Sequence, residues 1–295
     1  MLKYLRIKSK EIAVEPDRID LTGGRLATAP DLPITISSLN ELNQNIKQRI
    51  YRSLIPHDLL FRFDIDPVTW KGPDKTTYVS LRAEPGSNKV YIEARSPFDP
   101  DDPFFILEIE DNRFNRLDLN LIVLNDPNGE RFNTDVDSQG EQTLFGTVRR
   151  NLVAEEKAFH AGLAPGQVRH GVRGSAEVLH QLETFLIALG HRSINLEPLT
   201  YASALVFEHR GFAYILGHKF MDEIHQEFQP GGRLHSALDG STPFRQPHQW
   251  QSVRGRAWAI HDGLLSTIDK NWDALRMVKQ IGRHANVETF PDAVY

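Results

Sequence analysis

Cysteine is absent from this chain of 295 residues, which excludes disulfide bonds, thiolate metal sites and cysteine nucleophiles. Long apolar runs are also missing. No segment approaches the ~18 apolar residues that a membrane-spanning helix needs. The first twenty residues lack the apolar core of a signal peptide. These absences favour a cytoplasmic protein with no membrane partner.

An excess of basic residues is lacking as well. The chain has 34 Lys and Arg against 39 Asp and Glu, a formal net charge of -5. A nucleic-acid-binding protein usually shows a basic balance or a dense basic stripe, so we expect no nucleic-acid partner. The composition is 40% hydrophobic and 25% charged, which is typical of a globular protein.

Alternating hydrophobicity predicts antiparallel strands between residues 76 and 125. Residues 78–83 and 89–94 alternate apolar and polar side chains across a Glu-Pro-Gly-Ser-Asn turn. Residues 104–110 and 117–124 form a second such pair. Strands that follow one another across short turns pair antiparallel, so this region is expected to form a meander.

Helical periodicity, with apolar side chains three and four residues apart, recurs along the chain. The clearest case is residues 175–189, where Val178, Leu182 and Phe185 belong to one apolar stripe and Gly190 ends the helix. Further helices are expected at 39–54, 147–161, 202–210, 219–228 and 257–281, and short strands at 194–196 and 212–216.

Helices and strands therefore mix along the chain. The predicted fold class is α/β of the α+β type, with a mixed, mainly antiparallel sheet flanked by helices. Residues 1–217 are expected to form the domain that holds the sheet, with an N-terminal extension. Residues 218–295 are expected to form a mostly helical C-terminal extension packed on it.

A loop rich in glycine and arginine opens the helix at 175–189. Backbone N–H groups at a helix start are unpaired and carry partial positive charge, so an anion such as a pyrophosphate docks there readily. Glycines let the chain approach the anion closely. A simple glycine-rich turn with two solvated arginines is the alternative interpretation. The loop residues are Arg169, His170, Gly171, Val172, Arg173, Gly174, Ser175 and Ala176.

Two motifs here resemble the GNAT family of N-acetyltransferases. Gly174-Ser175-Ala176 matches the Gly-x-Ala end of the family's Q/R-x-x-G-x-G/A loop. Residues 204–212, Ala-Leu-Val-Phe-Glu-His-Arg-Gly-Phe, are similar to the family's ending in which a Tyr-Glu pair precedes Gly-Phe. The resemblance covers roughly residues 76–217. It implies a GNAT-like fold in which strand 117–124 precedes the loop, with a long insertion between them.

The resemblance also implies a function, the transfer of an acyl group from acetyl-CoA or another acyl-CoA to a small-molecule or peptide amine. The chain beyond the matched region is expected to pack on the sheet, cover the cleft or form a homodimer contact. The residues implied in binding the pyrophosphate of the co-substrate are Arg169, Gly171, Val172, Arg173, Gly174, Ser175 and Ala176.

Acyl transfer from a thioester needs a base that takes a proton from the attacking amine. Glu197 is the candidate base because it follows the short strand 194–196 and could face the cleft. Its alternative interpretation is a surface carboxylate before a proline. Glu108 and Glu110, on a strand of the meander, are alternative bases.

The leaving thiolate needs an acid, for which Tyr201 is the candidate and Tyr214 a second choice; both could equally be core or rim aromatics. The chain departs from the family at three positions. Gly171 stands where the loop has Gln or Arg, Phe207 replaces the usual tyrosine acid, and Thr200 replaces a common asparagine. These departures favour a second hypothesis, a non-catalytic GNAT-like ligand-binding or interaction protein.

Histidines are concentrated in the second half of the chain. His218, Asp222 and His225 follow at intervals of four and three residues, which places them on one face of a helix. Two histidines and a carboxylate can bind zinc or non-haem iron, and His235 or His261 could complete the set. A metal-dependent enzyme is therefore the third hypothesis. A solvated polar helix face is the alternative interpretation.

Overall fold

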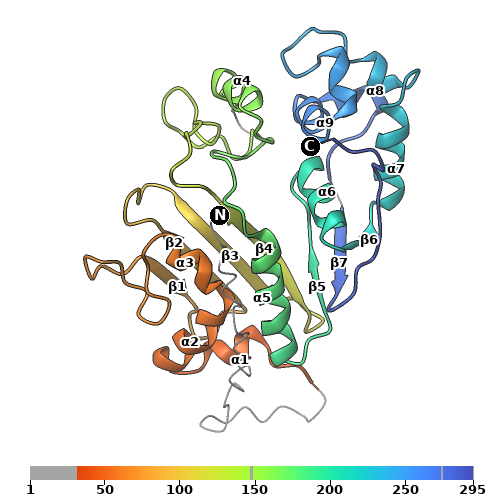
Figure 1. The fold of residues 1–295 in the computed structure, drawn as a ribbon. Coiled ribbons are helices and arrows are strands. Elements are labelled where there is room, and N and C mark those ends of the chain that lie inside the picture. The colour runs from red at the N-terminus through yellow and green to blue at the C-terminus, as the bar shows by residue number, and fades with distance from the viewer. Residues whose placement is uncertain (1–31, 147–148, 274, 295) are drawn as a thin grey trace, which may run out of the picture.

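The computed structural model describes residues 32–146, 149–273 and 275–294. In these residues a seven-stranded sheet has the strand order β1-β2-β3-β4-β5-β7-β6 (Figure 1). Neighbouring strands are antiparallel except for β4 and β5, which are parallel. The strands are β1 (Val79–Arg82), β2 (Lys89–Arg95), β3 (Pro103–Asp111), β4 (Leu117–Leu124), β5 (Ser193–Leu196), β6 (Ala213–Leu216) and β7 (Arg276–Gln280).

Helices flank this sheet, so the predicted class, α+β with a mixed and mainly antiparallel sheet, is confirmed. The α-helices are α1 (Ile36–Asn40), α2 (Gln44–Tyr51), α3 (His57–Phe61), α4 (Leu152–His160), α5 (Ser175–Ala188), α6 (Tyr201–His209), α7 (His218–Glu227), α8 (Arg233–Ser236) and α9 (Val253–His261). Three short 3-10 helices are η1 (Arg52–Leu54), η2 (Pro247–Gln251) and η3 (Leu264–Ile268). No helix in these parts of the chain is long and apolar enough to cross a bilayer.

The meander of β1 to β4 forms where alternating hydrophobicity predicts it. Successive side chains on a strand point to opposite faces of the sheet, so alternate residues share a face. On β2, Val90, Ile92 and Ala94 are buried, whereas Tyr91 and Glu93 between them remain partly exposed. One face of the sheet is therefore apolar and the other is polar.

Helices α1 to α3 and α5 cover the apolar face. The stripe predicted on α5 is buried there with residues of α2 and of the meander, including Tyr51 and Leu107. Burying one such aliphatic or aromatic side chain contributes about 1.5–3 kcal/mol. The polar face of the meander has no such cover among the residues of this core.

A second core forms around the C-terminal half. Helices α6, α7 and α9 with η3 bury Tyr201, Met221, Ala257 and Leu264 together. A smaller cluster joins the segment between β4 and α5 to α9, because Phe132 packs with Trp258.

The prediction of a single helix over residues 257–281 is wrong. Helix α9 ends at His261, and Gly263 and Asp269 on either side of η3 adopt left-handed φ values of 83° and 56°. Residues 276–280 then form β7, which pairs with both β5 and β6. Most apolar positions of this segment are buried, but they are divided among α9, η3, β7 and the residues between them.

Two other expected helices are shorter than predicted. The segment 39–54 is divided, because Asn43 caps a new helix by accepting a hydrogen bond from the Ile46 N–H. In the described part of the segment 147–161, which begins at residue 149, helix α4 starts at Leu152, and Asn151 caps its first turn. The strand β7, which lies in the predicted C-terminal extension, belongs to the same sheet as β1 to β6. The boundary at residue 217 itself stays a prediction.

Candidate functional site

The parallel strands β4 and β5 pair over a short stretch and then separate. Their paired residues are Leu117 with Ile194, Asp118 with Asn195, and Leu119 with Leu196. Strand β5 ends there, whereas β4 continues to Leu124. The second half of β4 pairs with β3 on one side, and on its other side, beyond the end of β5, no strand of the described chain pairs with it, which leaves an opening in the sheet.

A bulge marks the point where the opening begins. Opposite β4, Glu108 pairs with Leu121 and the next residue of β3, Ile109, pairs with Leu119, so Asn120 is an extra residue on β4. Bulges bend a strand and redirect its side chains, and they are common beside binding sites. This bulge lies directly after Leu119, the last residue of β4 that pairs with β5.

Backbone groups of β4 face the opening beyond the bulge. The N–H of Asn125 donates to the Phe104 carbonyl on β3. Antiparallel strands alternate in the side to which their backbone groups point, so those of Ile122 and Leu124 point away from β3. Consistent with this, a Cβ added at Gly171 would lie 3.1 Å from the Leu124 carbonyl oxygen.

The segment between β4 and α5 leaves the sheet and returns to the place where it left. The Asp126 N–H donates to the His170 carbonyl at 2.7 Å, and the Phe132 N–H donates to the Val168 carbonyl at 2.7 Å. The chain at Gly171 therefore resumes directly beside the end of β4. Residues 171–174 act as a short turn into α5, and the long segment 125–170 is inserted between the end of β4 and this turn.

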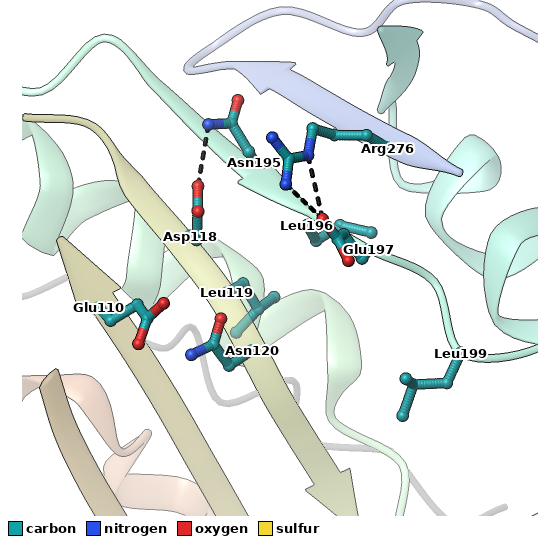
Figure 2. A pocket seen from close by; sticks show the side chains of 9 residues that line it. All are labelled: Glu110, Asp118, Leu119, Asn120, Asn195, Leu196, Glu197, Leu199 and Arg276. Carbon is teal, nitrogen blue, oxygen red and sulfur yellow. Dashed lines mark hydrogen bonds and ion pairs between the residues drawn. The ribbon is translucent and has the colours of Figure 1, made fainter. Parts of the chain in front are cut away.

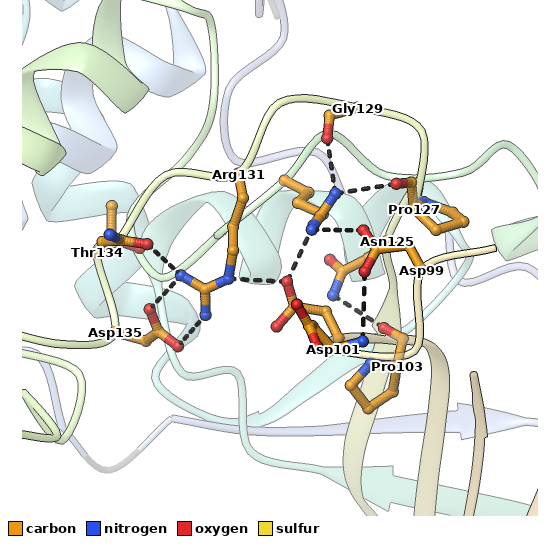
Figure 3. Close-up of polar contacts among 12 residues, drawn as sticks. Asp99, Asp101, Pro103, Asn125, Pro127, Gly129, Arg131, Thr134 and Asp135 are labelled. Carbon is orange, nitrogen blue, oxygen red and sulfur yellow. Dashed lines mark hydrogen bonds and ion pairs between the residues drawn. The ribbon is translucent and has the colours of Figure 1, made fainter. Parts of the chain in front are cut away.

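Arg169 closes this insertion by contacts within the protein. The guanidinium is buried and donates to the Asp99 carboxylate at 2.9 Å and the Asp102 carboxylate at 3.0 Å, and to the backbone carbonyls of Pro127 and Gly129. Figure 3 shows this network around Asp99, Pro127 and Gly129, with Arg131 beside it. These contacts use the N–H donors of the guanidinium. The prediction that Arg169 binds the pyrophosphate directly is therefore corrected.

Other arginines gather where α5 begins. Arg173 is exposed in the turn itself. Arg62, from the end of α3, donates to the Arg173 carbonyl at 2.5 Å, and Arg210, from the end of α6, donates to the Ser175 hydroxyl at 2.8 Å. The Nε of Arg210 is buried and has no hydrogen-bond acceptor among the described residues. Arg62 and Arg210 thus contact the turn and the first residue of α5, next to the unpaired N–H groups of the first helical turn, and Arg173 adds an exposed cation to the turn itself.

The loop glycines suit close approach of a ligand at that point. Gly174 has a φ of 155° and precedes the first helical residue, and no side chain caps α5. A helix end without a cap leaves its N–H groups available to an anion. The turn residues Gly171, Val172, Arg173, Gly174, Ser175 and Ala176 lie where an anion would contact the start of α5. Sequence spacing could not reveal Arg62 or Arg210, which come from distant elements.

A pocket of about 320 Å³ lies beside the paired part of β4 and β5 (Figure 2). The predicted base Glu197 is in its lining and forms an ion pair with Arg276 of β7. The alternative base Glu110 also lines it, whereas Glu108 does not and instead accepts a hydrogen bond from the Asn120 amide at 3.3 Å. The lining residues are Glu110, Asp118, Leu119, Asn120, Asn195, Leu196, Glu197, Leu199 and Arg276.

The candidate acid Tyr201 does not line this pocket. It begins α6, is 1% exposed and belongs to the C-terminal core, where the buried Arg256 donates to its hydroxyl at 3.3 Å. Burial lowers the pKa of Arg256. A tyrosine enclosed in this way cannot reach a leaving group in the pocket, so the prediction for Tyr201 is corrected.

Tyr214 is also committed elsewhere. Its hydroxyl donates to the Glu208 carboxylate at 2.5 Å, and Glu208 is fixed by two further donors from Thr289. Burial and the Glu208 charge raise the pKa of Tyr214. Phe207 packs edge-on against Phe212. Among the described residues, no tyrosine hydroxyl lines the pocket between β4 and β5.

His218, Asp222 and His225 do not form a common site. His218 and Asp222 are half exposed and 3.9 Å apart, whereas His225 contacts Gln229 and the buried Arg256. Over residues 32–146, 149–273 and 275–294, no three side chains of the metal-binding types come together.

Comparison of the chain with protein-family models, with curated proteins and with solved structures finds no match. The geometry around β4, β5 and α5 is therefore the basis for a functional assignment.

Proposed function

We propose that this chain is a divergent member of the GNAT family and transfers an acyl group from acyl-CoA to an amine. One observation carries the proposal: the parallel pair β4 and β5 separates beside the uncapped start of α5, where three arginines gather. A thioester that carries a pyrophosphate needs both features, an anion site and an extended slot. The location that we propose is the cytoplasm.

The start of α5 supplies the anion site. Backbone N–H groups of the turn and first helical turn can donate to a pyrophosphate, with Arg62, Arg173 and Arg210 adding full charges. Arg169 serves this site indirectly, since its contacts with Asp99 and Asp102 hold the insertion that returns the chain to Gly171.

The separated half of β4 supplies the slot. Backbone N–H and carbonyl groups that face the opening can pair with the amides of a pantetheine arm as a neighbouring strand would. An N–H near the bulge at Asn120 can polarise the thioester carbonyl and stabilise the oxyanion that forms when an amine attacks it.

The pocket supplies the proton acceptor. The Glu197 carboxylate stands at the end of β5, on the side of the opening, and Arg276 fixes its position. It can take the proton of the attacking amine directly or through a water molecule. Glu110, on the other side of the pocket, is the alternative. In the described parts of the chain no tyrosine hydroxyl lines the pocket, so we assign the proton of the leaving thiolate to solvent.

The missing phenol also favours a second candidate function, an acyl-CoA-binding protein that does not catalyse transfer. Many family members use a tyrosine as the acid. Here position 207 is phenylalanine, Tyr201 is buried elsewhere, and Tyr214 donates its hydroxyl to Glu208, so none of the three supplies this acid to the pocket. In this alternative the anion site and the slot still bind acyl-CoA, but no amine is acylated.

Calorimetric titration with acetyl-CoA and with CoA tests the ligand. We expect binding of both, and we expect the double substitution Arg62→Ala, Arg173→Ala to weaken it at least about tenfold, because hydrogen bonds to charged groups contribute about 1.5–3 kcal/mol each. The matched control is Arg113→Ala, which removes an exposed arginine from the turn between β3 and β4.

The outcomes separate the candidates. Binding with release of free thiol in the presence of an amine supports the transferase, and Glu197→Gln should then slow release without loss of binding. Binding without thiol release supports the non-catalytic alternative. Absence of heat with every acyl-CoA would reject both.

A further inference from the structure

A buried cation without a carboxylate lies in the C-terminal core. The Arg256 side chain of α9 is 0% exposed, and among the described residues no Asp or Glu lies within ion-pair distance of it. Its Nε donates to the Trp250 carbonyl at 2.6 Å, and its Nη1 lies 3.3 Å from both the Tyr201 hydroxyl and Nδ1 of His225. The Nη2 atom has no hydrogen-bond partner in the described chain. A buried charge is costly, so Arg256 depends on the few groups that surround it.

An aromatic side chain from the end of the chain covers this cation. Residues 284–294, which we call the C-terminal arm, follow β7 at the dark blue end of the chain (Figure 1). Phe290 of the arm is 5% exposed, and the guanidinium carbon of Arg256 lies 3.6 Å from the centre of its ring. This is a close cation–π contact in a site without water. The His225 ring meets the same phenyl ring at 5.3 Å, tilted by 63°.

The arm has other contacts with the core. Thr289 donates its N–H and its hydroxyl to the Glu208 carboxylate at 2.9 Å and 2.6 Å. A cavity of about 640 Å³ lies between α6 and the arm, and its wall includes Leu205, Glu208 and Phe290. The contact of Phe290 with Arg256 and His225 therefore also supports the wall of this cavity.

The contact between Arg256 and His225 requires a neutral imidazole. A guanidinium has donors only, so Nδ1 of His225 accepts and the ring proton lies on Nε2. Protonation adds a hydrogen to Nδ1, and two donors with two positive charges then face each other at 3.3 Å.

Three charged groups act on the His225 ring, namely Arg256 of α9, Asp222 of α7 and Asp292 of the arm. Burial and the Arg256 charge lower the pKa of His225 below its ordinary value of 6.5, against the effect of the two carboxylates. Both carboxylates are exposed, so water screens their charge. The arm in its docked position therefore disfavours a proton on His225.

From these contacts we propose that His225 is a pH-sensitive switch, and that protonation of its ring separates Phe290 from Arg256 and releases the C-terminal arm. Histidine is the side chain whose ordinary titration falls between pH 5 and pH 8. The proposal does not depend on acyl transfer, because every contact that carries it lies in the C-terminal core and the arm.

The direction of the pH effect follows from linkage. Above pH 6.5 the His225 ring is neutral in both states, and the arm stays docked. Below that value the released state binds a proton that the docked state resists. Each pH unit below 6.5 therefore raises the ratio of released to docked molecules by up to about tenfold, until the lowered pKa of His225 is reached.

Hydrogen exchange of the full chain at about pH 8 and about pH 5, corrected for the intrinsic exchange rate at each pH, tests the proposal. The Thr289 amide reports the docked arm, because it donates to Glu208. We expect its protection to be at least about fivefold lower at the acidic pH. Amides of β2 and β3 should stay protected at both values, which separates release of the arm from global unfolding.

Two histidine variants locate the titrating group. His225→Gln retains an oxygen that can accept from Arg256 and cannot bind a proton, so its Thr289 amide should be equally protected at both pH values. His284→Gln is the matched control, because it removes an exposed histidine of the arm itself, and it should keep the pH dependence. Circular dichroism establishes that each variant folds.

Equal protection of Thr289 at both pH values in the parent protein would overturn the proposal. So would a pH dependence that persists in His225→Gln or that disappears only in His284→Gln. Nuclear magnetic resonance titration of the His225 ring needs no variant. We expect the ring to titrate below pH 6.5, and titration at or above that value would reject the switch.

Discussion

His191 shows how one buried side chain couples stability to pH. It follows α5, and its Nε2 contacts the Ile34 carbonyl at 2.9 Å. Burial lowers the pKa of His191 below its ordinary value of 6.5, against the opposing effects of that contact and of the Asp111 charge. The folded protein therefore holds the imidazole neutral, whereas the unfolded chain binds a proton below pH 6.5.

We expect the free energy of unfolding to fall as the pH drops through 6.5 toward the lowered pKa of His191. His191→Gln keeps a donor near Ile34 and removes the titration, so its stability should fall less between about pH 8 and pH 5. Denaturant unfolding of both proteins across this range measures the difference. The neighbour Asp111 has a raised pKa and acts in the opposite direction, but it is present in both proteins. Parallel pH curves would assign the effect to another group.

Residue roles were predictable only where they depend on local sequence. The start of α5 follows from its glycines and its apolar stripe, and its candidate anion site includes the predicted turn residues 171–176. The role of Arg169 was not predictable, because Asp99 and Asp102 lie about 70 residues earlier and meet it only in the folded chain. Arg62 and Arg210 were missed for the same reason.

At the scale of elements, α9 contains a glycine that helix propensity alone would replace. Gly255 lies in the first turn of α9, where η2 crosses the helix closely. A Cβ added to Gly255 would lie 2.4 Å from the backbone oxygen of Gln249.

We expect Gly255→Ala to destabilise the protein by about 1–3 kcal/mol, although alanine is the better helix former by about 1 kcal/mol, because backbone atoms must shift to admit the methyl group. Arg254→Ala, at the adjacent exposed position, is the control and should change stability by no more than about 0.5 kcal/mol. Denaturant unfolding compares them. A Gly255→Ala protein at least as stable as the parent would contradict the close packing of η2 on α9.

The elements that the sequence predicts best are those with one dominant period. Strands β1 to β4 alternate over most of their length, and α5 keeps one apolar stripe, so both were found. The prediction of one helix over residues 257–281 failed because apolar residues spaced by three and four continue across Gly263 and Asp269, where the backbone turns. Spacing reports that such residues are buried; it does not report that they share one helix.

At the scale of the whole molecule, β7 joins the two halves of the chain. It pairs with β5 through residues such as Asn195 and Val278, and with β6 through Ala213 and the same Val278. Residues beyond 217 are thus an internal part of the sheet.

A chain that ends at residue 217 is therefore expected to lose cooperative folding, because β5 and β6 both lose the strand between them. Circular dichroism and urea unfolding of the shortened chain test this. Val278→Pro in the full chain removes one N–H from the ladder and should cost about 3 kcal/mol or more. A shortened chain that unfolds as sharply as the full one would establish residue 217 as a true domain boundary.

The candidate site is a property of the whole fold. Glu197 lines the pocket, since a carboxylate directly after a strand lies at the sheet end, and its role as a base stays a prediction. Asp118 and Asn195 were missed, because their register across a parallel pair depends on how α5 crosses from β4 to β5. Parallel pairing leaves no short turn between its strands for sequence reasoning to detect.

The position of β7 late in the sequence also determines when the sheet can be completed during synthesis. Strand β5 leaves the ribosome before its partner, and at about 5–20 residues per second the roughly 80 residues between them take several seconds to synthesise. For that time the nascent chain presents an open sheet edge, which readily pairs with other strands. Early shielding of that edge by a chaperone is therefore expected to govern how much of the newly made protein reaches its native state.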